Sequence, residues 1–189
     1  MKQQSFFPPI SREHGGILSV NKRRGRRSLA TKESIHVTLR SEIATGERSL
    51  LRHKDIIIAV MTRTQTLFRI KIYKYAICSN HIHLLIRGKN RTEIQNFFRV
   101  FAGHIAQLIL KRCPRTQQEI KKLAASQKGC PKNLRKFWQF LIYSRLITWG
   151  REFTRVVNYL VRNSLEALHI IAYKPRKKVR AGQPSRCRN

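Results

Sequence analysis

Alternation of apolar and polar residues predicts four β-strands, because side chains two positions apart in a strand share one face. The first strand is expected from Ser34 to Arg40. The second, from Phe68 to Cys78, leads almost directly into the third, from Ser79 to Arg87, so these two should form a hairpin. The fourth is expected from Phe137 to Thr148. In the first and third strands, the apolar face would be buried and the other face left largely polar.

Apolar residues spaced three and four apart predict three helices. The first covers about Arg48 to Thr66, although the β-branched isoleucines within it would also suit a strand. The second runs from Asn90 to Arg112 and begins with a capping box formed by Asn90 and Glu93. The third covers Gly150 to Leu168.

The predicted order is β-α-β-β-α-β-α, and its first six elements match the split βαβ, ferredoxin-like sandwich. We therefore predict an α+β fold, in which a ferredoxin-like sandwich gains a C-terminal helix that carries Tyr159. In this fold the first and third strands are central neighbours, and two helices cover one face of the sheet. His36 would then point to the same open face as His81 and His83.

Composition divides the chain into three parts. Residues 1–33 are expected to be a basic N-terminal arm, 34–172 the folded domain, and 173–189 a basic tail. Residues 1–30 should lack regular structure, because they combine prolines, glycines and a run of basic residues. The basic segment 113–136 should be a long surface loop with room for a short helix.

The charge balance indicates a polyanionic partner. The chain of 189 residues has 40 Lys and Arg against 9 Asp and Glu, a formal net charge of +31. Nucleic acid is the expected partner, because no long basic amphipathic helix with a lipid-type apolar face supports membrane binding. The longest apolar run, Ile56 to Met61, is too short to span a bilayer. Since residues 1–10 also lack a signal-type apolar core, we expect a cytoplasmic protein.

Scarce acidic residues and scattered cysteines exclude two kinds of site. Asp55 is the only aspartate, so the chain can hardly supply the carboxylate cluster of a two-metal nuclease. The four cysteines include no Cys-x-x-Cys spacing, which favours reduced thiols over a zinc ribbon. Cys78 lies in a strand pattern and is expected to serve packing.

His81 and His83 are candidate metal ligands. In a strand their imidazoles would point the same way, about 6–7 Å apart along the chain. Neutral imidazole is a common metal ligand, so the two could converge on one cation. Alternatively, they are two polar residues on the wet face of a half-exposed sheet.

The last helix carries a polar stripe that includes Arg155, Tyr159, Arg162 and Asn163. Tyr159 is either an amphipathic surface residue or a nucleophile. A divalent cation on two imidazoles and an amide oxygen could polarise a scissile phosphate for attack by the phenol. Arginines could bind the flanking phosphates. The product would be a covalent phosphotyrosine that preserves the phosphodiester energy for rejoining.

Two motifs together resemble a known family. His81-Ile82-His83, preceded by Ser79-Asn80, resembles the HUH motif, in which a bulky apolar residue separates two histidines. The segment from Tyr159 to Asn163 resembles the tyrosine-helix motif Tyr-x-x-x-Asn. The combination is similar to the single-strand DNA transposases of the insertion-sequence HUH type, and within them to the REP-associated tyrosine transposases. The resemblance covers about Ser34 to Ala172.

This resemblance implies a metal-dependent single-stranded DNA endonuclease and strand transferase, acting at DNA hairpins as a monomer or homodimer. Mg²⁺ or Mn²⁺ would be bound by His81 and His83, with Asn163 as third ligand. Tyr159 would form a 5′-phosphotyrosine bond and free a 3′-OH. Ser164 departs from the family pattern, which has proline there. Proline would end or kink the helix, whereas serine lets it continue.

Contacts to nucleic acid are expected from both charged and aromatic residues. The candidates for phosphate contacts are Arg23, Arg24, Arg87, Arg145, Arg155 and Arg162. Phe7, Trp138, Tyr143 and Trp149 could stack on unpaired bases, with core packing as the alternative for the phenylalanine and tryptophans. Two other functions remain open: a basic DNA or RNA hairpin-binding protein that retains the fold without catalysis, and an RNA-binding accessory protein of ribosomal type.

Overall fold

The computed structural model describes residues 12–20, 27–119 and 137–173. Its five-stranded sheet is antiparallel throughout and has the order β1-β5-β2-β4-β3. β2 and β4, the first and third predicted strands, are central neighbours, as a ferredoxin-like sandwich requires. The strands are β1 (Glu13–His14), β2 (Ser34–Arg40), β3 (Lys71–Ile77), β4 (His81–Arg87) and β5 (Tyr143–Ile147).

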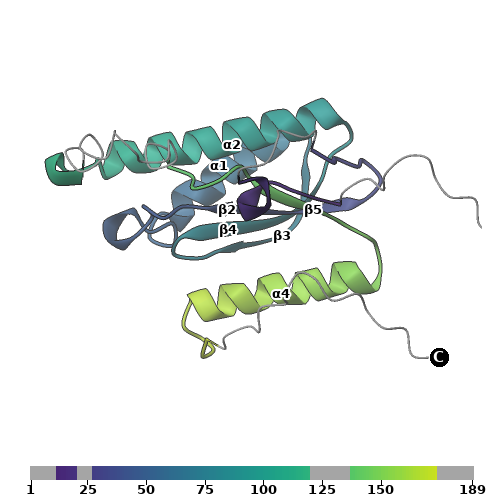
Figure 1. Ribbon diagram of the computed structural model, residues 1–189. Coiled ribbons are helices and arrows are strands. Elements are labelled where there is room, and N and C mark those ends of the chain that lie inside the picture. The colour runs from purple at the N-terminus through teal and green to yellow at the C-terminus, as the bar shows by residue number, and fades with distance from the viewer. Residues whose placement is uncertain (1–11, 21–26, 120–136, 174–189) are drawn as a thin grey trace, which may run out of the picture.

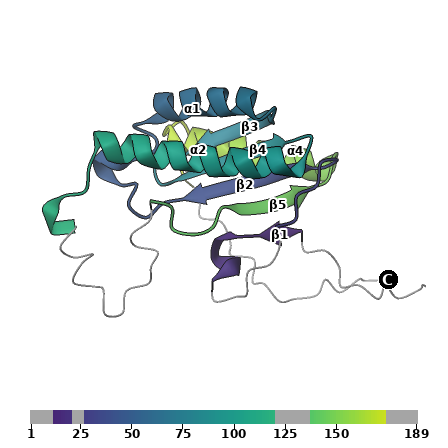
Figure 2. The same ribbon diagram turned by 90° about the horizontal axis from the view of Figure 1, so that it is seen from above.

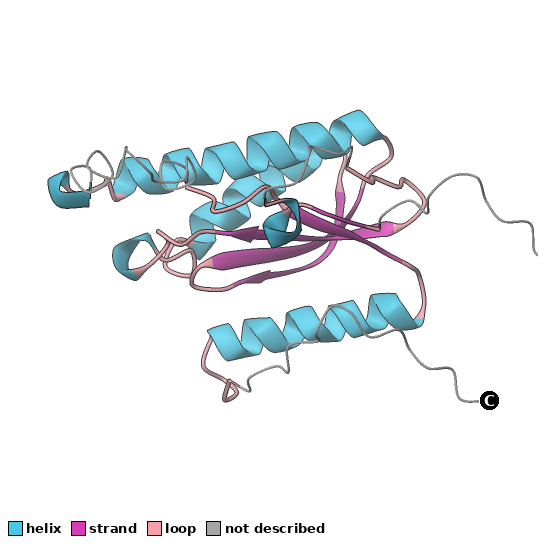
Figure 3. Ribbon diagram, in the orientation of Figure 1, coloured by secondary structure: helices cyan, strands magenta, loops and turns pink. Residues whose placement is uncertain are grey.

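Three long helices in the described segments cover the sheet. They are α1 (Lys54–Leu67), α2 (Arg91–Arg112) and α4 (Arg151–Ala167). α1 and α2 lie side by side on one face, and α4 lies on the other (Figures 1 and 2). The helix and strand layers are separated by colour in Figure 3. The predicted α+β sandwich with an added C-terminal helix is thus confirmed.

Burial follows the predicted alternation on the face beneath α1 and α2. Ile35 and Val37 of β2 are fully buried, and so are Leu84 and Ile86 of β4. Each such side chain contributes on the order of 1.5–3 kcal/mol to folding. This burial orients the strands, because it forces the alternate residues of β2 and β4 to face α4.

The start of α2 matches its predicted capping box. The Asn90 side chain accepts a hydrogen bond of 2.8 Å from the backbone N–H of Glu93. From there the helix lays an aromatic stripe on the sheet, in which Phe97 and Phe101 are buried and stacked with ring centroids 5.3 Å apart. The cap and the stripe together fix where α2 begins and which face it buries.

The fourth strand is shorter than predicted. β5 covers only Tyr143–Ile147, and the expected segment from Phe137 to Ile142 is irregular. Phe137 and Trp138 both pack into the core beneath α1 and α2, and the Trp138 indole donates to the carbonyl of Ala102 at 2.8 Å. Two consecutive side chains on the same side are incompatible with the alternation of a strand.

The first helix and second strand also begin later than predicted. α1 starts at Lys54, and a 3-10 turn over Gly46–Arg48 precedes it. The backbone N–H of Leu50 donates to the carbonyl of Ser79 at 2.8 Å, so this segment is tied to the β3–β4 connection instead. β3 begins only at Lys71, because residues 68–70 form the turn that ends α1.

The prediction that residues 1–30 lack regular structure is wrong for residues 13–19. Glu13 and His14 pair with Arg145 and Ser144 at the edge of β5, and a 3-10 turn follows. Gly15 permits this docking, because it has a φ of 85° and a side chain there would collide with the carbonyl of Ile142. The glycine that indicated a loop instead allows a close approach of two backbones.

Among the described residues, none of the helices combines the length and the hydrophobicity that a membrane span requires.

Candidate functional site

The pairing of β2 with β4 gathers polar side chains on the face that α4 covers. Thr38 lies opposite His83, and Arg40 lies opposite His81. His36 lies opposite Leu85, two positions further along. Cross-strand partners in an antiparallel pair point to the same side. His36 therefore shares the open face with both β4 histidines, as predicted.

α4 places Tyr159 directly against these histidines. The Tyr159 ring meets the His83 ring edge-on at 5.4 Å and the His36 ring at 6.0 Å between centroids. His83 also stacks on His36 at 5.3 Å and meets His81 edge-on at 4.8 Å. Four rings from three elements thus form one cluster.

The cluster depends on how α4 is anchored. Leu160, the residue after Tyr159, is fully buried in a small apolar cluster with Ala76, Leu85 and Ile147. This cluster lies on the α4 side of the sheet and fixes the rotation of the helix. Because Leu160 points into the sheet, its neighbour Tyr159 is presented beside it, where the histidines lie.

Hydrogen bonds orient the two β4 imidazoles. Nδ1 of His81 lies 2.7 Å from Oδ1 of Asn80, an acceptor only, so this nitrogen donates and the lone pair is on Nε2. Nδ1 of His83 lies 3.0 Å from Oγ1 of Thr38 and 3.3 Å from Nε2 of His36. Such partners on one ring nitrogen are typical of imidazoles that bind a metal through the other.

His36 and Thr38 complete the site, and neither was assigned a role from the sequence. Burial, together with the positive charge of Arg145, lowers the pKa of His36 to about 4. His36 is therefore neutral at physiological pH and can hydrogen-bond to His83 without adding charge. The alternation of β2 was the available signal, since it already placed His36 on the open face.

Asn163 lies one helical turn beyond Tyr159 and is 5% exposed. Its amide nitrogen donates to the backbone carbonyl of Tyr159 at 2.8 Å, which turns the donor end of the amide toward the helix backbone. The helix continues past the next residue to Ala167, as expected from a serine instead of proline. The Ser164 hydroxyl donates to the carbonyl of Leu160 at 3.1 Å.

The described residues include no group of three or more His, Cys, Asp or Glu side chains arranged to hold a metal ion. A third protein ligand within this part of the chain would have to be another donor type, such as an amide oxygen.

Two of the arginines predicted to bind phosphate are engaged in ion pairs. Arg145 lies 2.7 Å from Glu152 and 3.7 Å from Glu13, and Arg162 lies 2.9 Å from Glu166. Burial alone would raise the pKa of Glu152, but hydrogen bonds from Thr148 and the charge of Arg145 lower it. Glu152 thus remains ionised at neutral pH, and a phosphate would compete with it for Arg145.

The other predicted arginines differ in their surroundings. Arg155 is exposed on α4. Arg87 is exposed at the end of β4, where its Nε donates to the carbonyl of Thr31 at 3.0 Å and its guanidinium lies 5.7 Å from the Trp149 ring centroid. Arg23 and Arg24 lie outside the described residues.

The aromatic candidates for base stacking also differ in their exposure. Trp138 packs against the core, the alternative stated for it. Tyr143 is half-buried, and burial beside Glu13 raises its pKa to about 12. Trp149 is 44% exposed and remains accessible to a base. Phe7 lies outside the described residues.

One comparison with known proteins shows a family. The sequence profile described as "Transposase IS200 like" matches residues 34–128, just over half of the 189 residues. This range includes the histidine strand and ends before α4. A comparison with curated proteins finds no match.

Two solved structures are similar to this chain. One is a REP-associated tyrosine transposase bound to a REP hairpin, with 12% identity, a TM-score of 0.52, and coverage of 77% of this chain and 74% of that one. Another is a proposed transposase from Deinococcus radiodurans R1, with 13% identity, a TM-score of 0.41, and coverage of 76% and 98%. The first shows the fold, and the profile match shows the family. The chain therefore belongs to the family of IS200-like transposases.

Proposed function

We propose that this protein is a metal-dependent endonuclease and strand transferase that cuts single-stranded DNA at hairpins through a covalent 5′-phosphotyrosine. Tyr159 is the proposed nucleophile, and His81, His83 and Asn163 are the proposed metal ligands. The observation that carries the proposal is the edge contact of 5.4 Å between the Tyr159 and His83 rings. A merely structural surface tyrosine would have no need of this position.

The residues present fit a divalent cation by their chemistry. His81 and His83 each use Nδ1 in a hydrogen bond, so Nε2 is the nitrogen that would bind. Two imidazoles and the amide oxygen of Asn163 suit Mn²⁺ somewhat better than Mg²⁺ by ligand type. When bound, the cation would polarise the scissile phosphate and offset its developing negative charge.

The proposed reaction uses the protein's own groups as follows. The Tyr159 oxygen attacks the phosphorus and loses its proton to solvent, while the bond from phosphorus to the 3′ oxygen breaks. The 3′ oxygen gains a proton and leaves as a hydroxyl. Arg155 is exposed one turn before Tyr159 and would bind a neighbouring phosphate. Attack by another 3′-OH on the phosphotyrosine reverses these bond changes and joins the strands.

Two observations support the proposed substrate and a site built within one subunit. The structurally similar transposase is bound to a DNA hairpin, which supports hairpin DNA as the substrate here. Tyr159 and both histidines belong to one chain and contact one another, which supports a site assembled within a single subunit. A homodimer would then not need to exchange α4.

Incubation with single-stranded hairpin DNAs labelled at the 5′ or 3′ end tests the proposal on a denaturing gel. With Mg²⁺ or Mn²⁺, the wild-type protein should give a covalent protein–DNA band that carries only the 3′-side label. The band should disappear in Tyr159→Phe and in His81→Ala. Tyr75→Phe is a matched control, because it removes a hydroxyl from an exposed tyrosine of β3 that pairs with Leu84, on the other face of the sheet from the histidines.

A wild-type protein that retards the hairpins without forming a covalent band would contradict the proposal. That result would favour the hairpin-binding protein without catalysis. Persistence of the band in Tyr159→Phe would instead assign the nucleophile to another residue.

A further inference from the structure

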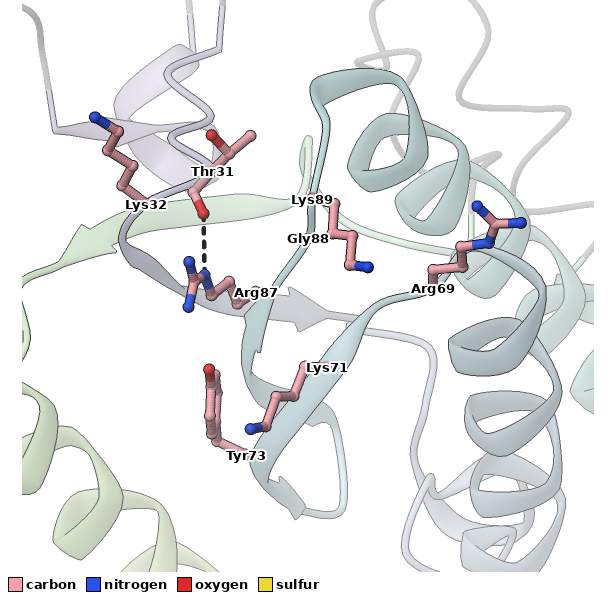
Figure 4. A pocket seen from close by; sticks show the side chains of 8 residues that line it. All are labelled: Thr31, Lys32, Arg69, Lys71, Tyr73, Arg87, Gly88 and Lys89. Carbon is pink, nitrogen blue, oxygen red and sulfur yellow. Dashed lines mark hydrogen bonds between the residues drawn. The ribbon is translucent and has the colours of Figure 1, made fainter.

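A second polar site lies at the end of β4 opposite His81. It is a pocket of about 420 Å³, within the size range of ligand sites. Figure 4 shows basic side chains around it that come from the residues before β2, from the α1–β3 connection with β3, and from the end of β4. Its lining includes no carboxylate and contains five cations, Lys32, Arg69, Lys71, Arg87 and Lys89.

No acidic partner in the described part of the chain neutralises the charges in this pocket. Within the described residues, no ion pair joins any of the five cations to a carboxylate, in contrast to Arg145 on β5 and Arg162 on α4. Lys71 lies 5.0 Å from the centroid of the Tyr73 ring, and Arg87 lies 5.7 Å from that of Trp149. Clustered like charges repel one another, so the pocket suits a polyanion that would relieve the repulsion.

Arg69 occupies a backbone conformation that arginine disfavours. Its φ is 51°, and it directly follows Phe68, the C-cap of α1. The N–H groups of Arg69 and Ile70 bond to the carbonyls of Thr66 and Gln65, the pattern of a Schellman motif. Glycine is the preferred residue at this position, because other residues are strained at positive φ. The chain bears this strain at a residue whose side chain lines the pocket.

Gly88 shapes the same pocket from β4. A side chain there would collide with Ile94 and Ile70. Only glycine lets the backbone pass this close to the core between Arg87 and Lys89, so both cations are held at the pocket wall.

The pocket lies on the same face of the sheet as the histidines, with the buried Leu85 between them under α4. Arg87 pairs with Lys71 across the hairpin, and alternation along β4 places Arg87 on the same face as His81 and His83. At the usual rise of a strand, Arg87 lies about 20 Å from His81 along β4. Several nucleotides of extended single-stranded DNA would span that distance.

We propose that this basic pocket binds backbone phosphates of the single-stranded flank next to the DNA hairpin. The inference rests on the proposed function, because that function places the scissile phosphate at Tyr159. The pocket holds the flank by charge and so sets which phosphate reaches the tyrosine. Trp149 beside Arg87 offers a partly exposed ring on which a flank base can stack.

Fluorescence anisotropy with labelled DNA tests this in the Tyr159→Phe background, where binding is measured without cleavage. The two probes are a hairpin alone and the same hairpin with a single-stranded flank. Lys71→Gln/Lys89→Gln should lower affinity for the flanked probe by about tenfold or more at low salt. It should reduce the slope of log K against log salt by roughly 1.4, which is about 0.7 for each lost phosphate contact.

Two controls separate the pocket from general charge. Arg63→Gln/Lys111→Gln also removes two exposed cations, but from α1 and α2 on the opposite face. It should leave the difference in affinity between the probes unchanged.

Arg69→Gly should raise the Tm yet weaken binding of the flanked probe. His169→Gly is its counterpart, because His169 has a φ of 57° just beyond the end of α4 and does not line the pocket. It should raise the Tm without changing binding.

The outcomes distinguish this inference from the proposed function. An unchanged salt slope in the pocket variant overturns the inference, even if wild-type protein forms the covalent band. Equal losses on both probes also overturn it, since the pocket would then contact the stem. A loss specific to the flanked probe sustains the inference, even if wild-type protein forms no covalent band and the proposed chemistry fails.

Discussion

Polar side chains at the two ends of β4 have different surroundings. At the His81 end, the imidazoles are oriented by Asn80, Thr38 and one another, and Tyr159 packs edge-on against them. At the Arg87 end, basic side chains surround an open pocket and lack carboxylate partners among the described residues. Chemistry at a fixed phosphorus requires defined angles, whereas holding a flexible strand requires mainly charge. One strand thus joins a positioned site to an electrostatic one.

Metal removal should give the largest contrast between these two ends. Treatment with EDTA, or His83→Ala in the presence of Mn²⁺, should abolish the covalent band, because the scissile phosphate would lose its polarising cation. The salt slope for flanked DNA should remain within experimental error, because the pocket contains no metal-type ligand set. Gel assay and anisotropy on the same samples provide the comparison.

A covalent band that survives EDTA at wild-type level would contradict the metal requirement of cleavage. A salt slope that falls with His83→Ala would contradict the independence of DNA binding at the Arg87 end, because the two ends would then be coupled.

Truncation of the α4 anchor should have the next largest effect. Leu160→Ala removes a fully buried side chain from the cluster with Ala76 and Leu85. It should lower the free energy of unfolding by about 2–5 kcal/mol in urea titrations. Since α4 also loses its rotational anchor, the yield of covalent product at equal folded fraction should fall too.

Leu168→Ala is the matched control, because Leu168 is the C-cap residue of the same helix and its side chain is 52% exposed. It should change stability by less than about 0.5 kcal/mol. Comparable losses in both variants would mean that α4 is not held chiefly by Leu160.

Loss of an imidazole's hydrogen-bond partner should have an intermediate effect. Asn80→Ala removes the acceptor 2.7 Å from Nδ1 of His81, so this ring can rotate or change tautomer. Loss of such a partner typically lowers metal affinity by about 10–100-fold. Calorimetric titration with Mn²⁺ measures the change. Ser79→Ala at the neighbouring position is the control, and equal affinities for all three proteins would exclude a positioning role for Asn80.

Sequence patterns predicted those parts of the fold that depend on neighbours in the chain. Alternation around Ile35 and Leu84 located both central strands, because burial of one face is recorded in the order of residues. The start of β5 was mispredicted, because Phe137 and Trp138 both pack into the core and Trp138 bonds to α2, which no local pattern encodes. Residues 13 and 14 form a strand only because the edge of β5 is available to them.

The site shows the same division. His81, His83 and Tyr159 could be selected from short motifs, and the structure brings their rings together. The roles of Thr38 and His36 depend on the register between β2 and β4, which a single sequence does not specify. The positive φ of Arg69 could not be predicted either, since glycine is the residue that normally indicates such a backbone conformation.

The smallest predicted effect concerns Arg145, a cation that is paired with carboxylates, unlike the cations of the pocket. Glu152→Gln removes the carboxylate 2.7 Å from Arg145, leaves only the contact of 3.7 Å with Glu13, and should make Arg145 more available to phosphate. Because the pair is partly exposed, its loss should cost only about 0.2–1 kcal/mol of stability. The pKa of Glu152 is lowered in the folded state, so this stabilisation is present above the ordinary pKa of 4.5 and disappears as pH falls through the lower folded value.

Urea titrations from pH 7 down to pH 3 should therefore show wild type and Glu152→Gln converging in acid. At pH 7 the same variant should steepen the salt slope for single-stranded DNA, because Arg145 would join the phosphate contacts. Glu166→Gln is a parallel test, since it removes the carboxylate that pairs with Arg162, close to Tyr159 on α4. If neither variant steepens the slope while the pocket double variant flattens it, DNA contacts are confined to the Arg87 end, and the paired arginines serve only to position β5 and α4.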